Sequence, residues 1–301
     1  MLVGISKRVI TIRDLPAMIE LFNRYESSVF GEIQTGEDEI RNMLNGIPET
    51  DRIGLFQNGD LSAASILTVK DHRLPALVIA EPNEKMGQYI TMLLNELISS
   101  AKAKKKDGQG DLIIILSANI EVEKRSFETC GFTPARYWFQ MKKELGSLPD
   151  PTLPAVYRIS SFQPASDTEK LHEAFEEVFS DHFDYHPSTL QDFKKRFQTP
   201  AFDPNLWYLL WKGDTLVGFA FSAVNEETKL GEITHIGIRR NWRRNGLAHD
   251  LLHQAFQTLK DYGMTTAALA VDSSSPTEAT IVYQKAGMYV YRGYTRYDLN
   301  V

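Results

Sequence analysis

The sequence predicts a mixed α/β (α+β) fold made of two similar domains in tandem. At 301 residues the chain is about twice the usual domain length, so each half can bury a core of its own. The order of strand-like and helix-like segments recurs in the second half, where Gly246 and Gly287 align with Gly87 and Gly131. Between the halves, residues 146–155 contain three prolines and no periodicity, as expected of a linker. The predicted domains are residues 1–145 and 156–301.

The first half begins with a strand at residues 7–13, where polar and apolar side chains alternate. Asp14-Leu15-Pro16 is a typical helix start, and a second helix is predicted at residues 36–44. The remaining elements are hairpin strands at 52–56 and 61–69 around Asn58-Gly59-Asp60, a strand at 77–80, a helix after Gly87, and strands at 112–116 and 137–141.

The second half repeats this order. Helices are predicted at residues 167–179 and 188–197, followed by hairpin strands at 206–211 and 215–224. A strand at 232–238, a helix from Leu247 and a strand at 265–272 complete the series.

The stretch from Gly231 to Leu259 organises the chain. Its strand alternates with period two, and its helix has an apolar stripe at helical spacing. Between them lies a basic loop, here called the anion loop, with the sequence Arg239-Arg240-Asn241-Trp242-Arg243-Arg244-Asn245-Gly246. Free N–H groups and the positive end of the helix dipole predict anion binding at such a helix start. The alternative is a solvated basic turn.

Two motifs in this half resemble signatures of the GNAT acetyltransferase superfamily. Arg243-x-x-Gly246-x-Ala248 resembles its pyrophosphate-binding motif. Ala279, Tyr283 and Gly287 follow at the spacing of its second signature. The chain is therefore identified as a tandem member of the superfamily, with a central, mostly antiparallel sheet and flanking helices expected in each half.

The resemblance implies acetyl-CoA as co-substrate, no metal, and direct attack of an acceptor amine on the thioester in a ternary complex. Backbone groups of the strand would bind the acetyl carbonyl, and the loop and helix start would bind the diphosphate. The cofactor-binding residues carried over are Ile236, Gly237, Ile238, Arg243, Arg244, Asn245, Gly246, Leu247 and Ala248.

Two side chains are expected to move protons. Glu232 is the candidate base that takes the proton of the acceptor amine, and its alternative is a solvent-facing strand glutamate. His235 is a second candidate, which strict alternation places on the opposite strand face. Tyr283 matches the tyrosine with which the family protonates the leaving thiolate, and its alternative is a tyrosine packed in the core.

The acceptor is expected to contact the polar loop at residues 181–187. Its candidate substrate-binding residues are His182, Asp184, Tyr185 and His186, which lack the helical spacing of a zinc site. The leading expectation is a small-molecule amine. The alternatives are a protein N-terminus or lysine as acceptor, or a CoA-binding module without catalysis. The presence of both Glu232 and Tyr283 argues against the last.

Composition excludes several other classes. The net charge of −6 argues against a general nucleic-acid-binding protein. No signal peptide opens the chain, and no apolar run reaches the roughly 18 residues of a membrane span. The single cysteine, Cys130, forms no intramolecular disulfide and fits a reducing compartment. We therefore expect a cytoplasmic enzyme, as a monomer or homodimer, with no nucleic-acid or membrane partner.

The first half departs from the pattern where chemistry would occur. Glu84, Tyr89 and Phe127 occupy the positions of Arg243, Ala248 and Tyr283. A carboxylate near a diphosphate costs roughly 1–4 kcal/mol at about 4 Å. We therefore expect the first domain to be degenerate and the second to be catalytic.

Overall fold

The computed structural model describes residues 4–105, 110–148, 153–199, 202–274 and 277–301. The chain divides into two compact units, each considered by itself below. Unit 1 comprises Met1–Trp138 and Gly293–Val301, and unit 2 comprises Phe139–Arg292. The segment predicted as a linker, residues 146–155, falls in the sequence of unit 2, and its residues 149–152 lie outside the described part.

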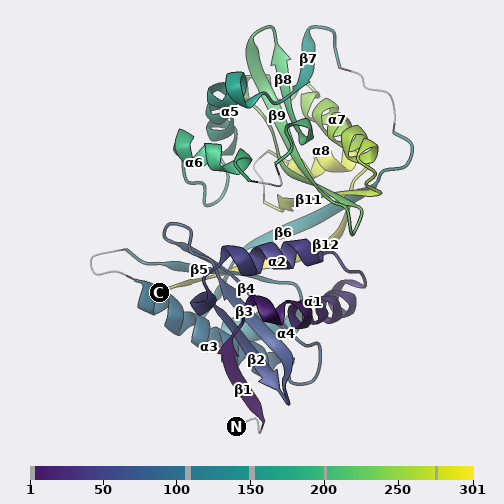
Figure 1. Cartoon of the computed structure of the whole chain (residues 1–301). Coiled ribbons are helices and arrows are strands. Elements are labelled where there is room, and N and C mark those ends of the chain that lie inside the picture. Colours follow the sequence, from purple (N-terminus) through teal and green to yellow (C-terminus); the bar gives the residue numbers. More distant parts are fainter. Residues whose placement is uncertain (1–3, 106–109, 149–152, 200–201, 275–276) are drawn as a thin grey trace. The chain divides into compact units, whose positions relative to one another are not determined.

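Unit 1 is a sheet with helices on it (Figure 1). Its strands lie in the order β1-β2-β3-β4-β5-β12-β6, and only the β4–β5 pair among the printed pairings of its described strands is parallel. The elements are β1 (Ile5–Val9), α1 (Leu15–Phe30), α2 (Glu37–Gly46), β2 (Arg52–Gln57), β3 (Asp60–Leu67), β4 (Arg73–Ala80), α3 (Met86–Lys104), β5 (Ile113–Ala118), α4 (Glu121–Thr129) and the start of β6 (Thr133–Glu144).

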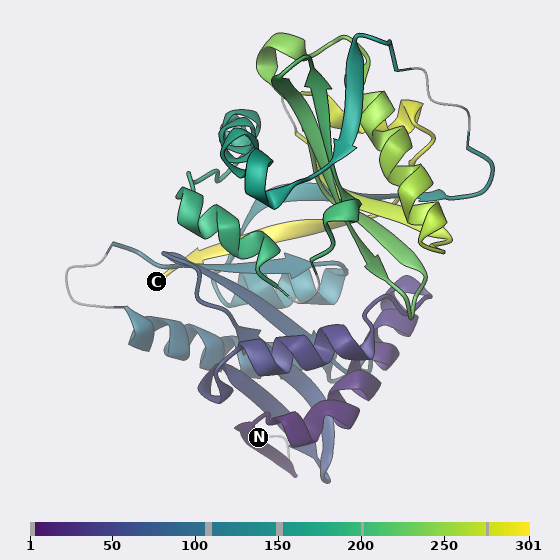
Figure 2. The same cartoon turned by 45° about the horizontal axis from the view of Figure 1, so that its top comes forward.

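Unit 2 repeats the plan, with strand order β7-β8-β9-β10-β11-β6-β12. In both views α5 and α6 lie on one side of this sheet, and α7 lies on the other (Figure 1, Figure 2). The elements are β7 (Tyr157–Ser161), α5 (Pro164–Phe179), α6 (Leu190–Lys194), β8 (Trp207–Lys212), β9 (Thr215–Asn225), β10 (Leu230–Ile238), α7 (Leu247–Asp261), β11 (Thr266–Asp272), α8 (Ala279–Lys285) and the start of β12 (Tyr289–Asn300). The expected mixed α/β fold with two tandem domains is confirmed.

Two long strands are divided between the units. The first part of β6 belongs to unit 1 and its second part to unit 2, whereas β12 starts in unit 2 and ends in unit 1. In unit 1 the end of β12 pairs with β5, from Thr295 opposite Ala118 to Asn300 opposite Ile113. The first half of the sequence therefore does not contain all the strands of unit 1.

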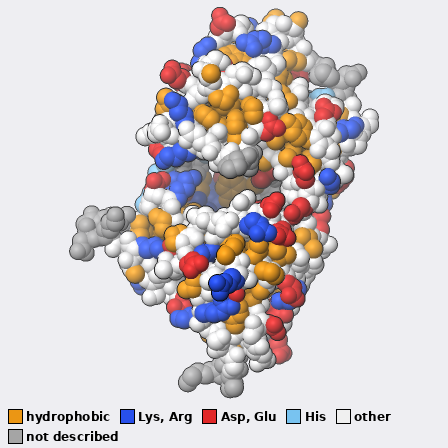
Figure 3. Space-filling model, in the orientation of Figure 1, with side chains coloured by type: hydrophobic (Ala, Val, Ile, Leu, Met, Phe, Trp, Pro, Cys, Tyr) orange, Lys and Arg blue, Asp and Glu red, His pale blue; other side chains and the backbone are white. Residues whose placement is uncertain are grey.

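The helices form where the apolar stripes predict them. In α7 the stripe residues Leu251, Leu252 and Phe256 are buried against the sheet. Burying one such side chain contributes about 1.5–3 kcal/mol. No helix in the described ranges combines the length and apolarity needed to cross a bilayer. Acidic and basic side chains are interspersed on the face drawn in Figure 3.

Candidate active site

The strands β10 and β11 are joined only at their beginnings. Their parallel ladder pairs Leu230 with Thr266 and ends with Glu232 opposite Ala268. On its other edge β10 continues to pair with β9 as far as Ile238. Beyond Glu232, the edge of β10 that faces β11 therefore has backbone groups without a strand partner among the described residues. Glu232 stands where the two strands part.

A β-bulge at Thr234 changes which side chains share a face of β10. Ile233 pairs with Ser222 and His235 with Phe221, so Thr234 is the extra residue. One extra residue shifts the alternation by one. His235 therefore lies on the same face as Glu232, and the opposite face predicted by strict alternation is wrong.

Contacts of β10 identify the two faces. The ring centroid of His235 lies 5.3 Å from that of Phe175 on α5, and a Cβ on Gly237 would lie 2.3 Å from Val178. Ile233 and Ile236 pack instead in a core cluster with α7 residues such as Leu252. The face of Glu232 is therefore the one covered by α5.

The surroundings of Glu232 favour the uptake of a proton by its carboxylate. Its side chain is open to solvent, and no hydrogen bond or ion pair of its carboxylate occurs among the described residues. Desolvation by the surrounding protein nevertheless raises the pKa of Glu232 above its ordinary value. A raised pKa brings a carboxylate closer to the range in which a general base works at neutral pH.

The end of the anion loop presents unpaired backbone donors. Arg244 has φ 64° and Gly246 has φ 79°, and α7 begins directly after Gly246. In the described part of the chain the backbone N–H groups from Arg244 to Ala248 donate to no protein acceptor. A Cβ on Gly246 would meet no atom within 4 Å, so the space in front of the loop is open. This is the geometry of a helix start that binds an anion.

Most of the loop's arginines are held by the carboxylates of α5 and the residues that follow it. The Nε of Arg239 donates to Glu177 at 2.7 Å. Arg240 forms a bidentate pair with Asp181, and the Nη1 of Arg243 lies 3.4 Å from the same carboxylate. Arg243 also donates from Nε to the carbonyl of Ile238.

Arg244 differs from these arginines. It is exposed, and no carboxylate partner of it is found among the described residues. The four arginines of the anion loop therefore have two different roles. Three of them fix the loop, and Arg244 with the N–H groups faces solvent.

The contacts with the arginines lower the pKa values of Glu177 and Asp181. Burial alone would raise the pKa of Glu177, but hydrogen bonds from the Arg240 N–H and the Arg239 guanidinium lower it overall. The hydrogen bond from Arg240 lowers the pKa of Asp181. Both groups are therefore anionic at neutral pH and hold the loop electrostatically.

Sequence reasoning missed this role of α5. Glu173, Glu177 and Asp181 recur every four residues and so follow one helix face. That spacing, read together with the cluster of arginines, was the available signal.

Tyr283 approaches from the other face of the sheet. It lies on α8 and packs against the same core cluster as Ile236. Its hydroxyl has no hydrogen-bond partner in the described ranges, and the ring is only partly exposed. Desolvation raises the pKa of Tyr283 to about 12. Glu232 and Tyr283 thus belong to opposite faces of the strands that part between them.

Two of the predicted acceptor-binding side chains, Tyr185 and His186, hold the conformation of their own loop. The Tyr185 hydroxyl donates to Glu176, and burial together with that contact raises the pKa of Tyr185. The Nδ1 of His186 lies 3.0 Å from the carbonyl of Asp184, whose φ is 58°. These contacts shape the loop.

His182 is placed differently in this loop. Its ring packs edge-on against Phe179, with centroids 4.6 Å apart, and His235 packs against the same ring. Desolvation lowers the pKa of His182, although its edge is open to solvent. His182 is therefore on the face of the sheet that carries Glu232.

The corresponding positions of unit 1 lack these features. At the start of α3 the N–H of Lys85 donates to the Asn83 side chain, and the N–H of Met86 to the Asn83 carbonyl. Glu84 is exposed in that turn. Pro75 closes the β4–β5 ladder where Glu232 closes the ladder of unit 2. The pairing of β3 with β4 runs from Ala63 to Leu67 without a bulge.

The two aromatic replacements in unit 1 are core residues. The N–H of Phe132 bonds to the carbonyl of Phe127 as that of Met288 bonds to Tyr283, so Phe127 and Tyr283 hold equivalent backbone positions. Phe127 is buried, and Tyr89 is buried with its hydroxyl donated to Gln57 at 2.5 Å.

The parting strands and the donor-rich helix start of unit 2 define the class of protein. Residues 168–288 match the Acetyltransferase (GNAT) family. The chain belongs to the GNAT acetyltransferase family and is an N-acetyltransferase.

Its relatives include proteins named mycothiol acetyltransferase. The one from Thermobispora bispora is 31% identical over 88% of this chain and 87% of that protein. The one from Streptomyces bingchenggensis is 30% identical over 54% of each chain, so the match spans about half of that relative's length. The resemblance to a tandem enzyme of the mycothiol synthase type, suggested by the linker position and the loop from Asp181, is confirmed.

Solved structures share the fold. A GCN5-related N-acetyltransferase from Sphaerobacter thermophilus superposes with a TM-score of 0.85 at 23% identity, over 99% of this chain and 96% of that chain. A tandem GNAT protein from the clavulanic acid biosynthesis pathway superposes with 0.75 at 10% identity, over 98% of each chain.

Proposed function

We propose that unit 2 transfers the acetyl group of acetyl-CoA to the amine of a small molecule, by direct attack in a ternary complex. The observation that carries this proposal is the contrast between the units. Unit 2 combines free N–H groups at the start of α7, a bulged strand and Glu232 at the ladder's end. Unit 1 has most of its helix-start donors occupied, a regular strand and Pro75.

Backbone N–H groups of unit 2 bind two parts of acetyl-CoA, the diphosphate and the acetyl oxygen. The N–H groups from Arg244 to Ala248 and the Arg244 guanidinium bind the diphosphate. The backbone of Ile236 to Ile238 lies along the unpaired edge of β10, where N–H donors stabilise the negative charge that develops on the acetyl oxygen. No metal is needed for these steps.

Glu232 accepts the amine proton. The nitrogen forms a bond to the carbonyl carbon, the carbon–sulfur bond breaks, and the amine proton goes to Glu232 directly or through water. The raised pKa of Glu232 suits this role. His182 and His235, on the same face, flank the acceptor's approach.

Tyr283 assists the leaving sulfur mainly as a hydrogen-bond donor. With a pKa of about 12 it keeps its proton throughout the working range. A thiol has an ordinary pKa near 8.5, so full transfer from Tyr283 would be uphill by roughly 5 kcal/mol. A hydrogen bond to the thiolate avoids that cost, and solvent completes the protonation.

The acceptor is a small metabolite rather than a protein. The name of the curated relatives makes a small thiol compound of the mycothiol type the first acceptor to test. We expect the enzyme to act in the cytoplasm, as a monomer or homodimer.

A direct assay tests the proposal. The purified full chain is incubated with acetyl-CoA and a panel of small amines, and acetylated products are identified by mass spectrometry because a thiol acceptor would obscure thiol detection. Peptides with a free N-terminus or a lysine form a second arm. Faster acetylation of the peptides would favour a protein acceptor. Saturable acetyl-CoA binding without turnover on any amine would make the chain a CoA-binding module.

A further inference from the structure

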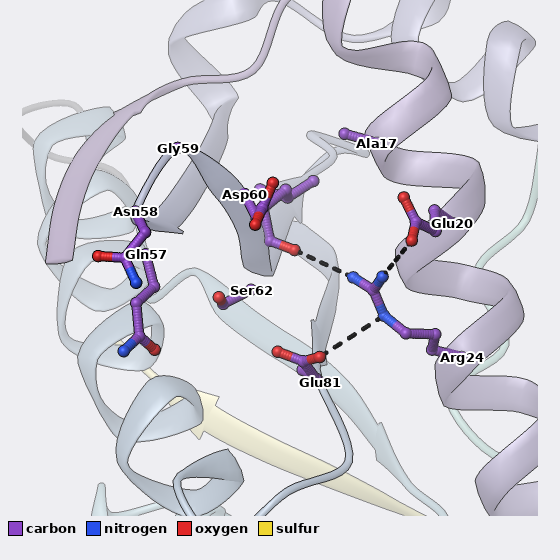
Figure 4. A pocket seen from close by; sticks show the side chains of 10 residues that line it. Ala17, Glu20, Arg24, Gln57, Asn58, Gly59, Asp60, Ser62 and Glu81 are labelled. Carbon is purple, nitrogen blue, oxygen red and sulfur yellow. Dashed lines mark hydrogen bonds and ion pairs between the residues drawn. The ribbon is translucent and has the colours of Figure 1, made fainter.

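Unit 1 contains a polar pocket that the proposed reaction does not use (Figure 4). It is an open pocket of about 380 Å³ between α1, the turn that joins β2 to β3, and the end of β4. That volume falls in the range of small-molecule sites, which begins near 300 Å³. All of its lining residues lie between Ala17 and Glu81.

The charged lining is acidic. Glu20, Asp60 and Glu81 contribute carboxylates, and Arg24 contributes the one guanidinium among the lining side chains. Arg24 lies between two of these acids, with Nη1 2.5 Å from Glu20 and Nε 3.7 Å from Glu81 (Figure 4). Asp60 has no ion-pair partner among the described residues. The lining therefore carries two more negative charges than positive ones.

A buried serine adds a second, independent observation. Ser62 is only 4% exposed, and it lines the pocket (Figure 4). Its carbonyl accepts the N–H of Glu81, but its hydroxyl has no hydrogen-bond partner in the described part of the chain. The side chain of a buried residue usually finds its hydrogen-bond partner within the protein, and a hydroxyl without one that lines a pocket is open to a ligand.

We propose that this pocket binds a short aliphatic diamine in its dicationic form. Two ammonium groups balance the two excess carboxylates and donate to acceptors, among them Asp60 and the Ser62 hydroxyl. An anionic ligand is disfavoured by the same charges. The site is specific to unit 1, because in unit 2 the ion pair between helix and loop has the opposite polarity, with Glu177 on the helix and Arg239 in the loop.

Titration calorimetry of the full chain with putrescine, at low ionic strength, tests the proposal. We expect saturable binding that Asp60→Asn weakens about tenfold or more, and that Ser62→Ala weakens about three- to tenfold, as for a lost charged and a lost neutral hydrogen bond. Butane-1,4-diol, which has the same length and no charge, should not bind. Absence of saturable putrescine binding by the parent overturns the proposal.

Two control variants locate the site. Glu84→Gln removes one negative charge from the turn after Glu81 without touching the pocket lining, and binding should stay within about twofold of the parent. A loss as large as that of Asp60→Asn would mean that only the net charge of unit 1 attracts the diamine. Glu232→Gln should also leave binding unchanged. Binding lost in Glu232→Gln and kept in Asp60→Asn would place the diamine in unit 2 and refute the pocket.

Discussion

The Nε of Arg239 lies 2.7 Å from the carboxylate of Glu177, and this pair ties the anion loop to α5. The same carboxylate accepts the backbone N–H of Arg240 at 2.9 Å. One acidic side chain thus fixes both the cation and the backbone of the loop. The donors that we assign to the diphosphate are therefore held in place before any ligand binds, which is the condition for efficient binding.

The charge of Glu177 should stabilise the fold at neutral pH and not in acid. Its pKa in the folded state is below the ordinary 4.5, so its contribution is present above that value and is lost as the pH falls through the lowered pKa. Glu177→Gln should lower the melting temperature by about 1–3 °C at pH 7, for a loss near 1 kcal/mol. The difference from the parent should shrink as the pH falls below 4.5 and vanish once Glu177 is protonated in the folded state. Glu169→Gln, an exposed change on the same helix, should have no effect at either pH.

Glu232→Gln should reduce turnover by roughly 10²–10⁴-fold with unchanged acetyl-CoA affinity, as for a lost general base. The acid limb of the pH–rate profile should flatten, because its pKa is that of the raised Glu232 carboxyl. The variant should melt no lower than the parent, since desolvation penalises the charged form. Glu226→Gln, in the exposed turn after β9, serves as control. Parental turnover by Glu232→Gln would leave proton removal to water.

Tyr283→Phe should slow turnover without weakening acetyl-CoA binding or lowering the melting temperature. Its hydroxyl has no partner in the described part of the chain, so only the contact with the leaving sulfur is removed. Tyr262→Phe is the matched comparison. Its hydroxyl lies 2.6 Å from Asp203, so that variant should lose some stability and keep full activity. The reverse pattern, with activity lost only at Tyr262, would contradict the assignment.

Gly246→Asp should abolish most acetyl-CoA binding, whereas Gly246→Ala should retain much of it. Both variants strain the backbone, because φ is 79°, at a cost of roughly 1–2 kcal/mol. Only Asp adds a negative charge in the open space before the loop, where repulsion costs roughly 1–4 kcal/mol. Calorimetry with acetyl-CoA measures the difference. Equal affinities for the two variants would move the diphosphate elsewhere.

The double variant Glu232→Gln, Tyr283→Phe asks which unit is catalytic. We expect no more than background acetyl transfer, because unit 1 has Pro75 and Phe127 at the corresponding positions. Substantial residual transfer that disappears on mutation of the α3 turn would show that unit 1 is active.

Elements that depend on neighbouring residues, such as an amphipathic helix or a tight turn, were predicted correctly from the sequence. The stripe of α7 is buried as expected, and the turn at Asn58-Gly59 adopts the positive φ values that these residues tolerate. The bulge at Thr234 left no such pattern, because the alternation of β10 reads regularly when its partner strand is unknown. Its consequence, the face of His235, was therefore predicted wrongly.

Interactions between distant segments were the other limit. The contacts of Glu177 and Asp181 with the anion loop depend on the packing of α5 against β10. The division of β6 and β12 between the units depends on strand pairing across more than half of the chain. Neither appears in a window of neighbouring residues.

Because β12 is shared between the units, it also determines the order in which they can complete their folding during synthesis. Domains usually fold as they emerge, with the N-terminal one first, at about 5–20 residues per second. Here the strand that lies between β5 and β6 of unit 1 is β12, which is synthesised after all the other helices and strands described. The unit made first is thus completed last. A nascent chain that has been made only as far as Arg292 already contains every helix described above, yet it leaves the edge of β5 uncovered.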